Sequence, residues 1–153
     1  MPAAVMQKGS ALMAIDFTTD FGKHALERLE TEETIWLTVV TPSGKPSPNP
    51  VWFLWHDGKV LIFSEPNVAK VKAILANPEV TLHFDAGESG EDVVILNGTA
   101  DATEKSISPE QAAAYLIKYR DGIERIGLTP ESMVAQYSRA IEVELTKLRG
   151  FVG

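Results

Sequence analysis

The sequence contains no cysteine among its 153 residues. Disulfide frameworks, thiolate zinc sites, iron–sulfur clusters and cysteine nucleophiles are therefore all excluded. A chain of this length buries about 70% of the surface that it exposes when unfolded, so its core needs no covalent cross-link. Any redox chemistry must come from a bound cofactor.

Basic residues and long apolar runs are also scarce. Lys and Arg number 14 against 21 Asp and Glu, and the formal net charge of −7 disfavours binding to nucleic acid and to anionic lipid. The longest apolar runs, 11–15 and 51–55, are far shorter than the roughly 20 residues that span a bilayer. The first run is also too short for a secretory signal. We therefore expect a cytoplasmic protein that binds neither nucleic acid nor membranes, with residues 1–16 as a flexible tail and residues 17–153 as one domain.

Six short runs of β-branched and aromatic residues predict strands. Turn residues at 42–45 and 56–59 separate the first three runs, as in antiparallel hairpins. These three runs are apolar almost continuously, so one face should line a barrel interior while the other meets a helix or a partner. We therefore predict a mainly β fold, a closed or nearly closed barrel that dimerises. The runs are Ile35–Thr41, Val51–Trp55, Val60–Phe63, Val80–Phe84, Val93–Leu96 and Ile141–Leu145.

Helices are predicted between these runs. Residues 17–30 and 67–77 carry apolar side chains at helical spacing, and Asn77-Pro78 ends the second of them. Ser108-Pro109-Glu110-Gln111 is a capping box with proline at the first helical position, and Thr129-Pro130 opens another short helix.

No metal site or hydrolytic triad is expected. His24, His56 and His83 fall on a helix, a turn and a strand, without the spacing that joins metal ligands. We interpret His83 as a packed or solvated side chain rather than a ligand contact. No Gly-x-Ser-x-Gly motif occurs, and the acidic run 85–92 does not match a calcium-binding loop.

Ser64-Glu65-Pro66-Asn67-Val68-Ala69-Lys70 is the most informative segment. A strand ends, a hydroxyl is presented, and Asn67 is placed to cap a helix whose first turn carries Lys70. Free amides, the helix dipole, the Ser64 hydroxyl and the Lys70 ammonium would together form a phosphate site. The alternative is that Ser64 and Asn67 only end a strand and cap a helix while Lys70 is solvated, because capping is common.

A proline-rich segment, Lys45 to Phe53, forms the second candidate. Pro46, Pro48 and Pro50 cannot donate to a central ladder, so this strand should begin at an edge, a bulge or an opening. Trp52 and Phe53 then offer flat apolar surface to an aromatic ring system. They serve equally well as core or dimer-interface aromatics.

Several of these segments, in their order and spacing, resemble a known family: Gly44-Lys45-Pro46, the run from Pro50 to Gly58, Ser64 to Lys70, Asn77-Pro78 and Val80 to Phe84. The family is that of the pyridoxamine 5′-phosphate oxidase-like split-barrel oxidoreductases, and the chain is most similar to the actinobacterial branch that uses the deazaflavin coenzyme F420. The resemblance implies a six-stranded antiparallel split β-barrel and a homodimer with a cofactor in the groove between subunits.

Site residues follow from this resemblance by position. Lys70 and Ser64, beside Asn67, would hold the cofactor phosphate, while Asn49, Pro50, Val51 and Trp52 would line the tricyclic ring; Thr38 is a weaker candidate for the ring edge. No catalytic residue is named, because the cofactor supplies the chemistry.

The chain also departs from the family pattern. Members that oxidise pyridoxamine phosphate resemble one another in carrying Arg and Lys on the strand that here reads Pro50 to Trp55, and in ending with a Trp- and Arg-containing tail that this chain lacks. FMN carries a phosphate monoester near −2, whereas the deazaflavin coenzyme carries a diester at −1, so fewer cations suffice for it. We therefore expect a deazaflavin reductase of a small conjugated organic substrate; FMN as cofactor, and a non-catalytic carrier of flavin, deazaflavin or haem, are the alternatives.

Overall fold

The computed structural model describes residues 15–105 and 107–153, so residues 1–14 of the predicted tail lie outside the described residues. The helices are α2 (Asp20–Thr31), α3 (Ala69–Ala76), α4 (Pro109–Arg125) and α5 (Pro130–Gln136). The strands are β1 (Thr34–Val40), β2 (Pro46–Trp52), β3 (Leu54–His56), β4 (Lys59–Ser64), β5 (Glu79–His83), β6 (Asp92–Asp101) and β7 (Arg139–Val152).

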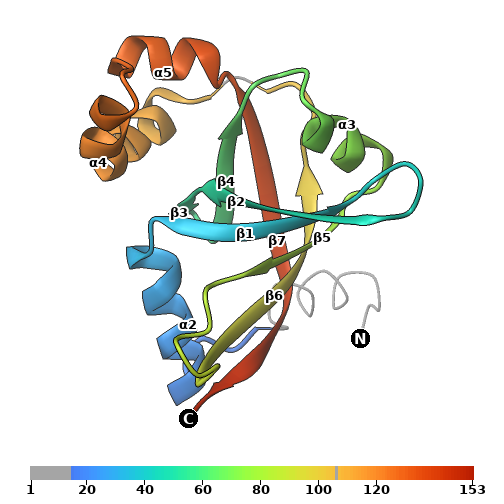
Figure 1. Ribbon diagram of the computed structural model, residues 1–153. Helices are drawn as coiled ribbons and strands as arrows, with labels where there is room; N and C mark the ends of the chain where they lie inside the picture. Colours follow the sequence, from blue (N-terminus) through green and yellow to red (C-terminus); the bar gives the residue numbers. More distant parts are fainter. Residues whose placement is uncertain (1–14, 106) are drawn as a thin grey trace, which may run out of the picture.

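The strands form one curled antiparallel sheet in the order β2-β1-β5-β6-β7-β4-β3 (Figure 1). Its two edge strands, β2 and β3, are consecutive in the chain and are joined by Phe53 alone. A single linking residue brings the two edges together, so the sheet must curl into a nearly closed barrel. The predicted split β-barrel class is confirmed.

The sheet has seven strands rather than the six predicted. The run predicted as one strand, Val51–Trp55, is divided at Phe53 into the end of β2 and the first two residues of β3. The reason is a tertiary contact: the Phe53 N–H donates to the Tyr119 hydroxyl, 2.9 Å away, instead of to a neighbouring strand. That partner lies 66 residues away in sequence, beyond the reach of a local pattern.

The proline-rich strand β2 lies at an edge of the sheet, as predicted. It begins at Pro46, earlier than the predicted start at Val51. Pro46, Pro48 and Pro50 pair with Val40, Thr38 and Trp36 of β1. Because they occupy alternate positions, all three direct their missing donors to the same side, the open edge, and the ladder with β1 keeps its hydrogen bonds.

Two apolar cores lie on opposite faces of β4, which explains why its sequence is apolar on both faces. Val60 and Ile62 face the barrel interior, while Leu61 and Phe63 face α4 and α5. Figure 1 shows α4 and α5 together at one end of the barrel and α2 at the opposite end. The second core therefore fixes the two C-terminal helices against the outside of the sheet.

Strands β6 and β7 are longer than the predicted Val93–Leu96 and Ile141–Leu145. Polar residues continue each strand, and the ladder between them carries an irregularity between Asn97 and Gly98. A Cβ at Gly98 would lie 2.7 Å from Val143 Cγ1 and 2.8 Å from the Glu144 carbonyl oxygen. Only glycine therefore allows this close approach of the two strands.

The predicted helices all form, with one error in detail. The capping boxes at Ser108 and Thr129 are both present. The cap of α3, however, is Val68 and not Asn67, and no side chain bonds to the first turn of the helix. Among the described residues, no helix is long and apolar enough to cross a membrane.

Candidate functional site

Lys70 lies in the first turn of α3, at the junction of two surface hollows, and lines both of them together with Pro50. It is half-buried, and within residues 15–105 and 107–153 no carboxylate lies within ion-pair distance of its ammonium. Burial lowers the pKa of Lys70 below its usual value, while the more distant Glu65 carboxylate partly opposes that shift. An anion bound at this position would restore the solvation that the ammonium has lost.

The start of α3 also offers backbone donors. Because Val68 provides no side-chain cap, the amides of the first turn keep their hydrogen-bonding capacity. Ala69 and Lys70, which begin the helix, both line the first of the two hollows. Uncapped amides, a helix N-terminus and an ammonium thus converge on one place, which is the arrangement that binds phosphate groups.

The two hollows differ in chemistry. We call the first the polar hollow; it lies between the β1–β2 hairpin and α3, and its polar lining includes Thr41, Ser47 and Asn49. We call the second, of about 210 Å³, the aromatic hollow; it lies between β2, β4 and the C-terminal helices. Its lining includes Trp52, Phe63, Tyr115, Met133 and Tyr137. Within the described part of the chain, Lys70 is the one basic residue that lines either hollow.

The structure brings together five of the eight predicted site residues. Asn49, Pro50 and Lys70 line the polar hollow, and Pro50, Val51, Trp52 and Lys70 line the aromatic one. The edge position of β2 produces this grouping, because it leaves the strand beside α3 without a further strand between them.

The other three predicted residues lie apart from the hollows. Ser64 is 3% exposed, and its hydroxyl donates to the Glu65 carbonyl at 3.0 Å. Asn67 is exposed in the loop before α3. Thr38 lies on the face of β1 opposite to buried Val39 and lines a separate depression with Thr81 and Asn97.

The C-terminal helices contribute residues that the sequence reasoning missed. Tyr115, Met133 and Tyr137 come from α4, α5 and the end of α5, and all three reach the aromatic hollow. Their sequence signal was ordinary, because apolar residues at helical spacing indicate packing and not a ligand. Only the second core, which places α4 and α5 over β4, brings them to the site.

The three tryptophans lie on the first three strands, but they do not form one exposed patch. Trp52 stacks on Tyr119, with ring centroids 4.6 Å apart, and Trp55 packs edge-on against Phe17 at 6.0 Å. Trp36 stacks on His83 at 6.0 Å on the outer face of β1 and β5. Only this third pair faces away from both cores.

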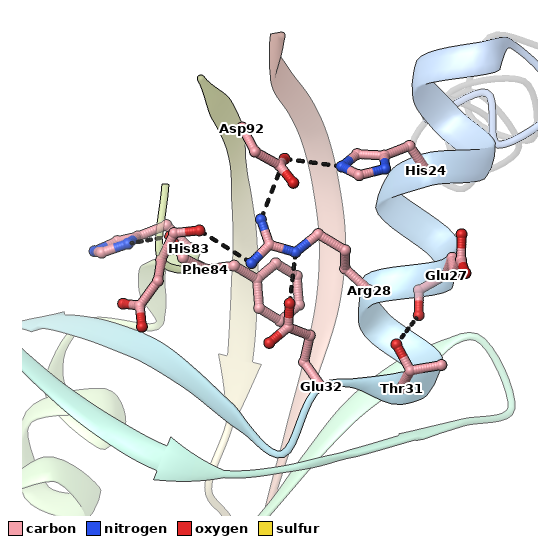
Figure 2. A network of polar contacts seen from close by, with 9 residues as sticks. His24, Glu27, Arg28, Thr31, Glu32, His83, Phe84 and Asp92 are labelled. Atoms are coloured by element: carbon pink, nitrogen blue, oxygen red, sulfur yellow. Dashed lines mark hydrogen bonds and ion pairs between the residues drawn. The ribbon is translucent and has the colours of Figure 1, made fainter. Parts of the chain in front are cut away.

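Arg28 of α2 is the centre of a polar network that the sequence did not indicate (Figure 2). Its Nε donates to Glu32 at 2.7 Å, and one terminal nitrogen donates to the Asp85 carbonyl at 3.0 Å. The other lies 3.2 Å from the Asp92 carboxylate, which also contacts His24 at 2.8 Å. Through these contacts Arg28 joins α2 to the residues on both sides of the loop between β5 and β6. Residues 15–105 and 107–153 hold no group of three His, Asp or Glu side chains placed to bind a metal.

Comparisons with known proteins agree with the fold. The family model described as pyridoxamine 5′-phosphate oxidase matches residues 21–151, whereas no match was found among curated proteins. The chain is similar to a solved F420 reductase at 23% identity, over 80% of this chain and 94% of that one, with a TM-score of 0.62. It is also similar to a conserved hypothetical protein from Mycobacterium tuberculosis, at 16% identity over 88% and 86% of the two chains, with a TM-score of 0.69. The haem storage protein HutZ from Vibrio cholerae is similar at 16% identity over 85% and 93%, with a TM-score of 0.56.

The three solved structures are distant in sequence and establish the fold alone. The family model, in contrast, spans most of the chain, from α2 to the end of β7. The protein therefore belongs to the pyridoxamine 5′-phosphate oxidase family.

Proposed function

We propose that the protein is an oxidoreductase that binds the deazaflavin coenzyme F420 and reduces a small conjugated organic substrate. The observation that carries this proposal is the half-buried Lys70 ammonium, without an ion-pair partner among the described residues, at the junction of the polar and aromatic hollows. One cation suits a phosphodiester of charge −1 better than a phosphate monoester near −2.

The residues present fit such a cofactor. Lys70 and the uncapped amides at the start of α3 would hold the phosphate, and the polar lining of the neighbouring hollow suits a hydroxylated chain. Pro50, Val51 and Trp52 would contact the tricyclic ring with apolar and aromatic surface. When bound, the deazaflavin supplies a hydride donor.

The part of the protein in this chemistry is to bind, orient and exclude water. We assign no side-chain acid or base to the reaction, because the bound cofactor would supply its chemistry. Lys70 fixes the anionic end of the cofactor, and the stacked Trp52 limits the movement of its ring. The substrate would approach the open face of the ring from solvent.

The cofactor preference tests the proposal. We expect the deazaflavin coenzyme to bind at least about tenfold more tightly than FMN in separate fluorescence titrations, roughly 1.4 kcal/mol. The net charge of −7 penalises a dianion more than a monoanion at the enclosed phosphate position. Oxidation of the reduced coenzyme over a panel of enones and quinones then tests turnover.

The salt dependence of the two titrations gives a further check. The glutamate tail of the coenzyme would be disfavoured by the negative net charge unless it reached solvent or met Lys45 and Lys72, and salt would screen this repulsion within about 8 Å at physiological ionic strength. The preference should therefore persist, and grow slightly, from low to physiological salt. Equal affinity for FMN, or protein purified with stoichiometric FMN, would contradict the assignment, and stoichiometric haem without turnover would indicate a carrier.

We further propose that the protein is a homodimer. The outer face of β1, β5 and β6 carries Trp36, Val40, His83 and Ile95, all only partly buried in the isolated chain. Trp36, His83 and Ile95 lie side by side in the strand register, and burial of this face against a second copy would remove its apolar surface from water. Sedimentation velocity at micromolar concentration should give a single species of twice the chain mass, whereas a stable monomer would contradict this prediction.

A further inference from the structure

The aromatic wall of the candidate site rests directly on the backbone of α4. The Trp52 ring, which lines the aromatic hollow, lies flat on Tyr119, with an interplanar angle of 8°. Three residues later, after a kink in α4 at Tyr119, a Cβ added at Gly122 would lie 3.0 Å from Trp52 Cζ2 and from Trp52 Cη2. Gly122 is itself buried and has no positive φ, so its role is to leave space and not to permit a special backbone conformation.

Tyr119 also fixes the chain on which Trp52 sits. Its hydroxyl accepts from the Phe53 N–H at 2.9 Å and lies 2.6 Å from the Glu33 carbonyl and 2.7 Å from the Phe53 carbonyl. A phenol has one proton to donate, and the Lys118 ammonium already donates to the Phe53 carbonyl at 2.8 Å. The Tyr119 hydroxyl therefore donates to the Glu33 carbonyl while it accepts from the Phe53 N–H, and the Phe53 carbonyl has Lys118 as its donor.

Burial changes the pKa values of both side chains that hold Phe53, Tyr119 and Lys118. It raises the pKa of Tyr119, which stays protonated and able to donate at any physiological pH. Burial also lowers the pKa of Lys118 to about 8, with Glu33 and Glu32 opposing that shift. The ammonium remains the predominant form at pH 7, and it lies 3.9 Å from the centre of the Phe53 ring. The backbone that carries Trp52 is thus held from both sides by α4.

We propose that Gly122 and Tyr119 set the width of the aromatic hollow through Trp52, and thereby determine the size of the planar fused-ring ligand that this site accepts. The inference rests on the proposed function only in placing a fused ring against Trp52. The hollow, of about 210 Å³, is smaller than the roughly 300–1,000 Å³ of most small-molecule sites. A shift of the Trp52 ring by a few tenths of an ångström therefore changes what fits.

Two contacts of the Trp52 ring decide how it responds to a larger residue at position 122. Tyr119 covers one face of the indole, and Gly122 lies against the edge of its six-membered ring. A methyl group at position 122 would crowd this edge and displace the Trp52 ring, which forms part of the lining of the hollow. A wider ligand loses contact before a narrower one does, so the effect is selective for ring size.

Gly122→Ala tests this inference with lumichrome, a three-ring molecule that has neither the phosphate nor the side chain of a flavin. Lumichrome fluorescence titrations should show about tenfold weaker binding to the variant, within the range for one methylene in an apolar pocket. Lumazine, with two rings, should be weakened much less. The melting temperature, measured in parallel, shows that the variant is folded, because the higher helix propensity of alanine and the crowding of Trp52 act in opposite directions.

Trp52→Phe provides the matched second variant. Phenylalanine lacks the Cζ2 and Cη2 atoms that a Cβ at position 122 would approach. Gly122→Ala in the Trp52→Phe background should therefore cost little or no further lumichrome affinity. A loss in that background equal to the loss in the wild type would overturn the inference, because the effect would not pass through Trp52.

Two more outcomes would also overturn it: wild-type affinity of Gly122→Ala for lumichrome, or no binding of lumichrome to the wild-type protein. The deazaflavin titration is a separate measurement that depends on Lys70. Lumichrome binding without deazaflavin binding would contradict the proposed function and leave this inference intact. Deazaflavin binding without lumichrome binding would contradict this inference and leave the proposed function intact.

Discussion

Replacing Arg28 with methionine should lower the free energy of unfolding by about 2 to 3 kcal/mol. Breaking a buried ion pair costs about 3 to 5 kcal/mol, and here the Glu32 and Asp92 side chains keep some solvent contact, at 38% and 28% exposure. The Arg28 side chain itself is only 11% exposed and also lies over the Phe84 ring, 4.7 Å from its centre. Methionine preserves most of that packing but none of the charge.

The reason for the size of this effect is that Arg28 joins three parts of the fold. It connects α2 to Asp92 at the start of β6, as Figure 2 shows. It also connects α2 to the Asp85 carbonyl after β5. Without it, the carboxylate of Asp92 keeps only His24 as a partner and the Asp85 carbonyl loses its donor. The loop between β5 and β6 should then detach from the helix.

Urea denaturation followed by circular dichroism measures this change. Arg120→Met, on the exposed side of α4, is the control for the loss of one positive charge and should change the unfolding free energy by less than about 0.5 kcal/mol. Arg28→Lys should recover only part of the lost unfolding free energy, because a lysine ammonium cannot reproduce the contacts of the guanidinium to Glu32, Asp85 and Asp92. Equal stability of Arg28→Met and the wild type would show that the network contributes nothing.

The structure separates what local sequence can reveal from what it cannot. The turn at Asp57-Gly58 has positive φ at both residues, 51° and 73°, and glycine in that place already predicts it. The proline spacing of β2 likewise predicts an edge strand, because the missing donors permit nothing else. These features depend on residues within one short segment.

The errors arose where the deciding partner is distant in sequence. Phe53 divides a strand because Tyr119 binds it, and Arg28 is clamped by Asp85, 57 residues later. His24 contacts Asp92, 68 residues away, and nothing in the local sequence of the helix indicates that pair. Periodicity carries no information about such pairs, so the predicted site contained the β2 and α3 residues and lacked those of α4 and α5.

The cap of α3 failed for a different reason. Asn67 and Val68 are adjacent, and the favourable propensity of asparagine for a cap decided the prediction. In the structure the helix begins one residue later, with Val68 as its cap, so Asn67 is left exposed. The absence of a side-chain cap favours the proposed anion site, because no side chain occupies the amides of the first turn of α3.

Replacing Lys70 with alanine should weaken deazaflavin binding by about 1.5 to 3 kcal/mol, roughly 10- to 150-fold in dissociation constant. This range is that of a hydrogen bond to a charged group. Lys23→Ala is the matched control, because Lys23 is exposed on α2 at the opposite end of the barrel and its loss changes the net charge equally. Fluorescence titration of both variants with the deazaflavin should separate the contact of Lys70 with the cofactor from the effect of net charge on binding.

The stability of the free protein gives an independent check of the same residue. Burial lowers the pKa of Lys70 in the folded state, so between that value and the unfolded pKa near 10.5 the unfolded chain binds more protons. The wild type should therefore gain stability from Lys70 as the pH rises through this window, and Lys70→Ala should lose that part of the rise. Below the window the variant should be at least as stable as the wild type, because it no longer buries an unpaired ammonium.

Unchanged coenzyme affinity in Lys70→Ala would show that the start of α3 is an ordinary helix end and that the anion binds elsewhere.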